Sequence, residues 1–95
     1  MATVKEEPDA IRRGSGRLYI DTKSGKAELL YRIEGTIMSI YHTYVPDPER
    51  GRGLAERLAV AAFEDAEKRG LKVRPDCSYI RHFVGKHREF SGITV

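Results

Sequence analysis

The amino-acid sequence predicts one compact α+β (α/β) domain with a mixed sheet and the element order β-β-β-α-β-α. Three observations support this fold class. Three short segments rich in β-branched and aromatic residues follow one another in the first half of the chain. A long segment with helical spacing comes next, followed by a short apolar segment and a second helical segment. The length of 95 residues leaves room for a single hydrophobic core.

The first three strands are separated by short turns, at residues 21–26 and 34–35, each of which contains a glycine. Short connections of this kind predict an antiparallel meander. The strands are expected at residues 17–20, 27–33 and 36–45. In front of them, residues 1–11 are polar, contain a proline and show no period. They are expected to form a flexible N-terminal tail, so that the domain spans residues 12–95.

The second half of the chain supplies the helices. Apolar residues recur with helical spacing over residues 54–69, and Gly70 suits the position after a helix end. Residues 71–75 form a short strand, expected to be parallel to the third because a helix connects the two. A second helix is predicted over residues 77–87, and residues 93–95 are expected to return to the sheet.

The composition limits the classes of function. The net charge is +3 and the pI is about 9.2, with the basic residues scattered along the chain. This charge suits a small anionic ligand and does not require nucleic acid. One cysteine excludes an internal disulfide, and together with three dispersed histidines it gives no metal-binding spacing. Without an apolar segment of membrane-spanning length or a signal core, the protein is expected in the cytoplasm.

A glycine-rich loop lies between the third strand and the first helix, with the sequence Arg50-Gly51-Arg52-Gly53-Leu54-Ala55. Two glycines allow a tight turn that presents bare backbone N–H groups. The helix start adds unpaired N–H groups and the positive end of its dipole. This arrangement is typical of a phosphate or pyrophosphate site. The alternative is an ordinary helix entry with glycine at the turn.

The pattern Arg50-x-x-Gly53-x-Ala55 resembles the Arg/Gln-x-x-Gly-x-Gly/Ala signature of GNAT-type N-acetyltransferases. More narrowly, the chain resembles the small single-domain group of predicted N-acetyltransferases with this fold. The segments that carry this resemblance occur in the group's order, over about residues 17–90: His42 to Pro46, Arg50 to Ala55, Lys72 to Cys77, and the helix that contains Tyr79.

The resemblance implies a compact GNAT-like domain that binds acetyl-CoA (coenzyme A). The loop is expected to hold the pyrophosphate mainly through N–H groups, with charge-assisted bonds from an arginine. Main-chain groups at the end of the third strand are expected to pair with the pantetheine arm. Many members use a tyrosine on the last helix to protonate the leaving thiolate. The expected cofactor-binding residues are Tyr44, Val45, Arg50, Gly51, Arg52, Gly53, Leu54, Ala55 and Tyr79.

Two residues are candidates for catalysis. Cys77 lies at a predicted helix N-terminus, which favours a thiolate, although Asp76 opposes this effect. It is expected either to accept the acetyl group or to assist the leaving thiolate. His42, near the end of the third strand, is expected to deprotonate an amine or to orient Cys77. The alternatives are a small buried cysteine and a hydrogen-bonded histidine in the sheet.

The function expected is that of a minimal N-acetyltransferase acting on an amine or protein acceptor, directly or through acetylated Cys77. One alternative is a non-catalytic CoA-binding or regulatory module. The other is a small basic nucleic-acid binder, ranked last because interleaved exposed aromatics and a clustered basic face are missing. GNAT enzymes carry helices between their first two strands, where this chain has only a turn. The acceptor side is therefore expected to be open or completed by a partner, in a monomer or weak homodimer.

Overall fold

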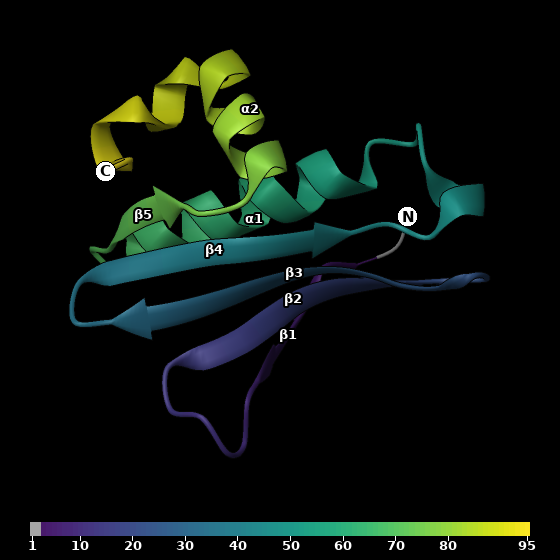
Figure 1. The fold of residues 1–95 in the computed structure, drawn as a ribbon, viewed down its shortest axis with the longest axis horizontal. Helices are drawn as coiled ribbons and strands as arrows, with labels where there is room; N and C mark the ends of the chain where they lie inside the picture. The colour runs from purple at the N-terminus through teal and green to yellow at the C-terminus, as the bar shows by residue number, and fades with distance from the viewer. Residues whose placement is uncertain (1–2) are drawn as a thin grey trace.

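Five strands form one mixed sheet, and two α-helices cover one of its faces (Figure 1). This computed structural model describes residues 3–95, so Met1 and Ala2 of the expected tail lie outside the described residues. The predicted fold class is confirmed. The elements are β1 (Lys5–Pro8), β2 (Ser15–Thr22), β3 (Gly25–Glu34), β4 (Ile37–Tyr44), η1 (Asp47–Glu49), α1 (Leu54–Lys68), β5 (Lys72–Pro75), α2 (Ser78–Lys86) and η2 (Arg88–Ile93).

The strands lie in sequence order across the sheet, from β1 to β5. The first four are antiparallel, and β5 is parallel to β4, with α1 as the connecting helix. The predicted meander and crossover are therefore present. The C-terminal segment also returns to the sheet, because Thr94 bridges to Val73 and the Val95 N–H donates to the Val73 carbonyl at 2.9 Å.

Strand β1 is an addition to the predicted order. Residues 5–8, which the sequence placed in a tail, pair with β2 along its outer edge. All four residues are exposed, and ion pairs hold the strand in place: Lys5 with Asp21 and Glu7 with Arg17. An edge strand that is held by ion pairs need not alternate apolar and polar residues, so hydrophobic periodicity does not predict it. The division of the chain at residue 12 stays a prediction.

The turn between β2 and β3 is shorter than the sequence indicated. Residues 21–26 were expected to form the turn, but Asp21 pairs with Lys26 and Thr22 with Gly25 within the hairpin. The Asp21 carboxylate lies 2.9 Å from the Lys26 ammonium, so a cross-strand ion pair extends the ladder through polar residues.

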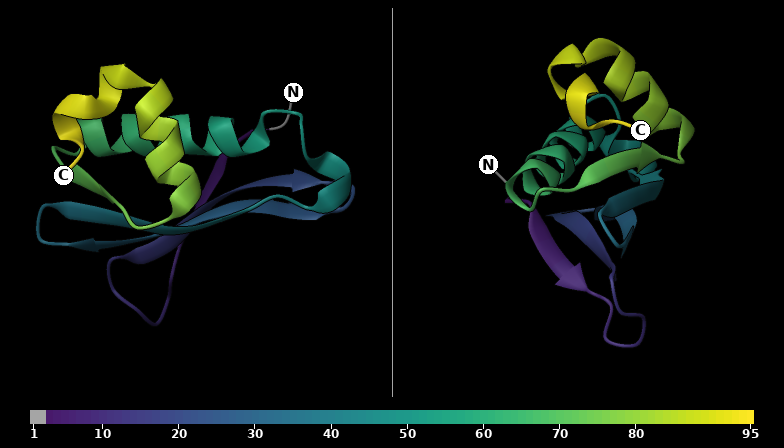
Figure 2. Two further views of the ribbon diagram at one scale, coloured as in Figure 1. Left: turned by 45° about the horizontal axis from the view of Figure 1, so that its top comes forward. Right: turned by 90° about the vertical axis from the view of Figure 1, so that its left-hand side faces the viewer.

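Both helices lie over one face of the sheet (Figure 2), and the hydrophobic core lies between them and that face. Leu18, Leu29 and Ile40 point to this helix-covered face and are buried. Helix α1 contributes Leu58 and Phe63. The Phe63 ring packs against Phe83 on α2 and Phe90 on η2, with centroid distances of 5.3 and 5.1 Å. The opposite face, which we call the outer face, carries no helix; Arg17, Leu30 and His42 are paired across it.

Strand β4 has two irregularities near its end, a bulge against β3 and an early end of its pairing with β5. The register against β3 shifts between Leu30 and Tyr31, so that Tyr41 forms a β-bulge. The parallel ladder with β5 runs only from Ile37 to Ile40, and the Asp76 N–H donates to the Ile40 carbonyl at 3.0 Å. Strand β5 ends at Pro75, whereas β4 continues beyond Ile40 to Tyr44, which leaves a gap beside the end of β4. Residues 41–44 pair with no strand of residues 3–95 on this side, where the Thr43 N–H faces Cys77.

Candidate functional site

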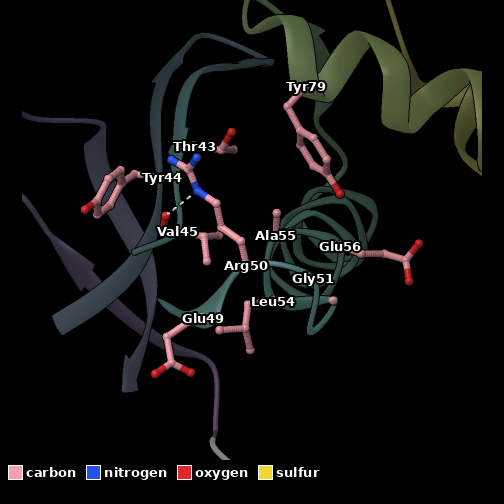
Figure 3. A pocket seen from close by; sticks show the side chains of 11 residues that line it. Thr43, Tyr44, Val45, Glu49, Arg50, Gly51, Leu54, Ala55, Glu56 and Tyr79 are labelled. Carbon is pink, nitrogen blue, oxygen red and sulfur yellow. Dashed lines mark hydrogen bonds between the residues drawn. The ribbon is translucent and has the colours of Figure 1, made fainter. Parts of the chain in front are cut away.

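A pocket of about 550 Å³ lies on the helix-covered face, where the end of β4 separates from α2 (Figure 3). Its walls come from the end of β4, the loop before α1, the first turn of α1 and the start of α2. Eight of the nine residues predicted to bind the cofactor line it. The lining residues are Thr43, Tyr44, Val45, Glu49, Arg50, Gly51, Gly53, Leu54, Ala55, Glu56 and Tyr79.

The glycine-rich loop has the open backbone that an anion site needs. Gly51 and Gly53 adopt φ angles of 83° and 75°, in the left-handed region that favours glycine. A Cβ atom at either position would meet nothing within 4 Å beyond its chain neighbours. Gly53 is also the N-cap of α1, and no side chain in residues 3–95 caps this helix. The first-turn N–H groups of α1 therefore lack a side-chain acceptor.

The two loop arginines lie differently from one another. Arg50 lines the pocket; its Nε donates to the Val45 carbonyl at 3.1 Å, and its guanidinium lies 3.0 Å from Asp47 (Figure 3). Arg52 is absent from the pocket lining. It lies 3.5 Å from the carboxylate of Glu49, on the side of the loop that faces Thr22 and Lys23. The structure therefore brings Arg50, but not Arg52, into the pocket.

Glu49 is a site residue that the sequence analysis missed. Its side chain is only 11% exposed, and it accepts a hydrogen bond from the Ser24 hydroxyl at 3.3 Å. It thus ties the β2–β3 turn to the glycine-rich loop. A buried carboxylate beside an anion site opposes the binding of phosphate. The proline-rich segment before the loop gave no signal for this role, because η1 alone turns Glu49 inward.

Cys77 lies at the gap between β4 and β5, as the N-cap of α2. Its Sγ atom is 3.5 Å from the Thr43 hydroxyl. Burial acts to raise the pKa of the Cys77 thiol, but the Thr43 hydroxyl and the N–H groups of Ile80, Tyr79 and Thr43 together hold it below its ordinary value. Cys77 does not line the pocket itself, yet its neighbours Thr43 and Tyr79 do.

Tyr79 is the second residue of α2, and its half-buried phenol faces the pocket (Figure 3). Burial raises the pKa of this phenol, and the carboxylate of Glu56 on α1 raises it further. The phenol therefore keeps its proton at neutral pH. Glu56 is held by His87, whose Nε2 lies 3.1 Å from Oε2, and the His87 ring stacks on Phe83. These contacts join the two helices beside the pocket.

His42 lies away from Cys77. Its register with Leu30 places it on the outer face, where it is exposed, whereas Thr43 points to the helix-covered face. Thr43 therefore makes the contact with Cys77 that the sequence analysis expected of His42. The role of His42 as a base for an amine stays a prediction.

Residues 3–95 lack two further kinds of feature, a metal-binding cluster and a membrane-spanning helix. No group of three or more His, Cys, Asp or Glu side chains is arranged to hold a metal ion. None of the helices in this range has the length and apolar character needed to cross a membrane.

Comparison of the sequence with known proteins identifies a family. Residues 17–93 match the family described as GCN5-related N-acetyl-transferase, so the match covers most of the domain. Protein NATD1 of Bos taurus and that of Homo sapiens are each 43% identical over 60 residues, which cover 62% of this chain and 53% of each relative. Protein NATD1 of Danio rerio is 42% identical over 74 residues, covering 77% of this chain and 67% of that relative.

The chain spans about half the length of the mammalian relatives that it matches. The match nevertheless runs from β2 to η2 and includes the glycine-rich loop, the gap between β4 and β5, and Cys77. The chain belongs to the GCN5-related N-acetyl-transferase family.

Proposed function

We propose that the protein binds acetyl-CoA in the pocket beside the glycine-rich loop and transfers the acetyl group to an amine. The end of β5 at Pro75, which leaves residues 41–44 of β4 without a strand partner on that side, is the observation that carries this proposal. It creates an open strand edge that runs from the loop to Cys77. A long ligand with an anionic end and a reactive thioester end fits this path.

The residues around the pocket fit the parts of acetyl-CoA. The open backbone at Gly51 and Gly53 and the uncapped start of α1 suit the pyrophosphate. Arg50 adds a guanidinium, which must exchange its bond to the Val45 carbonyl for one to a phosphate oxygen. The free edge of Tyr44 and Val45 suits the pantetheine amides, as a peptide adds to a sheet edge.

The chemistry proposed is direct aminolysis of the thioester. A neutral amine attacks the carbonyl carbon, a C–N bond forms, and the C–S bond breaks to release CoA thiolate. Backbone N–H groups at the bulged end of β4 stabilise the negative charge that develops on the carbonyl oxygen. Tyr79 donates its proton to the departing sulfur, since its raised pKa keeps the phenol protonated. The amine loses its own proton to solvent or to His42.

A relay through Cys77 is the second candidate mechanism, and its lowered thiol pKa is the observation that favours it. In this route the Cys77 thiolate takes the acetyl group from acetyl-CoA, and the amine then attacks the new thioester. Incubation with acetyl-CoA alone, followed by intact mass spectrometry, separates the routes. An added acetyl group that is absent in Cys77→Ser supports the relay; unmodified protein with amine-dependent CoA release supports direct transfer.

Calorimetry tests the binding site. Ala55 lies in the first turn of α1 and lines the pocket, where a carboxylate is compatible with the helix but repels phosphate. We expect Ala55→Glu to weaken acetyl-CoA binding by about tenfold or more, and Ala55→Gln, of equal size, to weaken it less. If both variants bind acetyl-CoA as tightly as the parent protein does, this pocket is not the acetyl-CoA site. Binding without any amine-dependent CoA release would favour the non-catalytic module.

A further inference from the structure

The outer face of the sheet carries a groove that the proposed function does not use. It consists of two adjoining cavities of about 500 and 240 Å³, which share Ser15 and Tyr41. The larger cavity lies under the connection between β1 and β2. The smaller, which we call the inner cavity, is lined by Arg12, Ser15, Arg32, Ser39, Tyr41 and Asp76.

The connection between β1 and β2 forms a fixed wall of this groove. The Asp9 carboxylate accepts hydrogen bonds from the N–H groups of Ile11 and Arg12, at 2.8 and 3.1 Å. Gly14 ties the wall to the sheet, because its carbonyl accepts the Ile33 N–H at 2.7 Å. A Cβ atom on Gly14 would lie 2.4 Å from the Ile33 oxygen, so the close approach requires glycine.

The inner cavity reaches the same gap as the acetyl-CoA pocket, from the opposite face. Tyr41 is the bulged residue of β4, immediately after the last residue that pairs with β5. Asp76 donates its N–H to Ile40 and precedes Cys77. The gap is thus bordered by Tyr41 and Asp76 on the outer face, and by Thr43 and Cys77 on the helix-covered face.

The side chains of the inner cavity suit a small molecule with charges of both signs. The guanidinium groups of Arg12 and Arg32 can donate hydrogen bonds to a carboxylate, as can the hydroxyls of Ser15 and Ser39. The Arg32 Nε lies 3.6 Å from the Glu34 carboxylate, which leaves its terminal N–H groups for a ligand. The Asp76 carboxylate, held at 2.9 Å by Arg74, stands at the end next to Cys77. An ammonium group that reaches the gap would share this carboxylate with Arg74.

We propose that the inner cavity binds the acetyl acceptor, and that this acceptor is an amino-acid-like molecule. Its carboxylate lies towards Arg12 and Arg32, and its amine lies towards Asp76 and the gap. The assignment as acceptor rests on the proposed function, whereas binding of an amino acid in this cavity does not. The connection between β1 and β2 therefore takes the place of the missing acceptor wall.

Binding is tested first without acetyl-CoA. The common L-amino acids are titrated into the isotopically labelled protein, and the backbone amide signals of Arg12, Arg32 and Tyr41 are followed by NMR. Alanine, leucine, phenylalanine and lysine are compared with their decarboxylated amines. We expect at least one amino acid to shift these signals, and its decarboxylated counterpart to bind about tenfold more weakly or not at all.

Variants locate the contact. Arg12→Gln and Arg32→Gln both lie at exposed positions. Each is expected to weaken amino-acid binding by about tenfold and to leave acetyl-CoA affinity unchanged. Arg13→Gln removes a charge from the same connection, outside the cavity lining, and is expected to change neither. With acetyl-CoA present, the same amino acid should drive CoA release.

Three results would overturn the proposal: no amino acid shifts the signals, the decarboxylated amines bind equally well, or the arginine variants bind like the parent. Amino-acid binding without CoA release would overturn the acceptor role and leave a ligand site. Amino-acid binding in a protein that fails to bind acetyl-CoA would refute the proposed function and sustain the cavity assignment.

Discussion

The Oγ1 atom of Thr43 lies 3.5 Å from the Sγ atom of Cys77, across the gap where β4 and β5 separate. This contact joins the open edge of β4 to the first turn of α2. It also helps to hold the pKa of the Cys77 thiol below its ordinary value, against the effect of burial. The protonation of the single cysteine therefore depends on a residue that lies 34 positions earlier in the chain.

Thr43→Val should raise the pKa of Cys77, because it removes the hydroxyl and preserves the side-chain shape. The thiolate is the reactive form and is lost as pH falls through the pKa, so a higher pKa means slower alkylation at neutral pH. We expect the rate with iodoacetamide at pH 7 to fall severalfold, as for one hydrogen bond worth about 1 kcal/mol, and the pH profile to move upward. Thr36→Val serves as the control. An unchanged profile would show that the backbone N–H groups of Thr43, Tyr79 and Ile80 lower the pKa without the hydroxyl.

Tyr79→Phe should reduce kcat and leave acetyl-CoA affinity nearly unchanged. The phenol is proposed to protonate the leaving sulfur, and general acids contribute about 10² to 10⁴ in rate. Because the pKa of Tyr79 is raised, the parent rate should show no loss of this acid between pH 7 and pH 9. Stopped assays of acetylated product measure both rates, with Tyr19→Phe on the outer face as the control. Full activity in Tyr79→Phe would show that Tyr79 is not the general acid that protonates the leaving sulfur.

Glu49→Gln should tighten acetyl-CoA binding by about threefold to tenfold, since it removes a buried negative charge beside the anion site. The amide can still accept the hydrogen bond from Ser24, so the loop should keep its position. Calorimetry at low and moderate salt measures the change, and exposed Glu67→Gln on α1 provides the matched loss of charge. Weaker binding in Glu49→Gln would mean that the carboxylate is needed to shape the loop.

Tyr31→Phe should lower the free energy of unfolding by about 1 kcal/mol, because the Tyr31 hydroxyl donates to Glu6 on β1. A loss of that size lowers the Tm of a domain of this length by roughly 4–8 °C. Amide hydrogen exchange should accelerate most in residues 5–8, which depend on this bond and on ion pairs. Uniform acceleration across the sheet would indicate that the phenol supports the core instead of β1. Tyr19→Phe again serves as the control.

Much of the fold follows from local patterns in the sequence. The meander, the crossover helix and the glycine-rich loop are signalled by alternation, helical spacing and turn residues, and all are present in the structure. Strand β1 is not signalled, since Glu6 and Glu7 gain their place through tertiary partners rather than through apolar period. Local patterns cannot reveal which distant charge will complete an edge strand.

The candidate site divides in the same way. The loop and Tyr79 could be placed from motifs, because their positions depend on neighbours in the sequence. Thr43 and Glu49 could not: the role of the first depends on where β5 ends beside β4, and that of the second on how η1 turns before the loop. His42 was expected to deprotonate an amine or to orient Cys77, and the register assigns it to the outer face, because one residue of shift exchanges the faces of a strand.

The gap between β4 and β5 also has a kinetic consequence. The pocket and the inner cavity share no lining residue, so the two proposed ligands can enter and leave independently of one another. We therefore expect the proposed ternary complex to assemble in either order, and product inhibition patterns to report random rather than compulsory release.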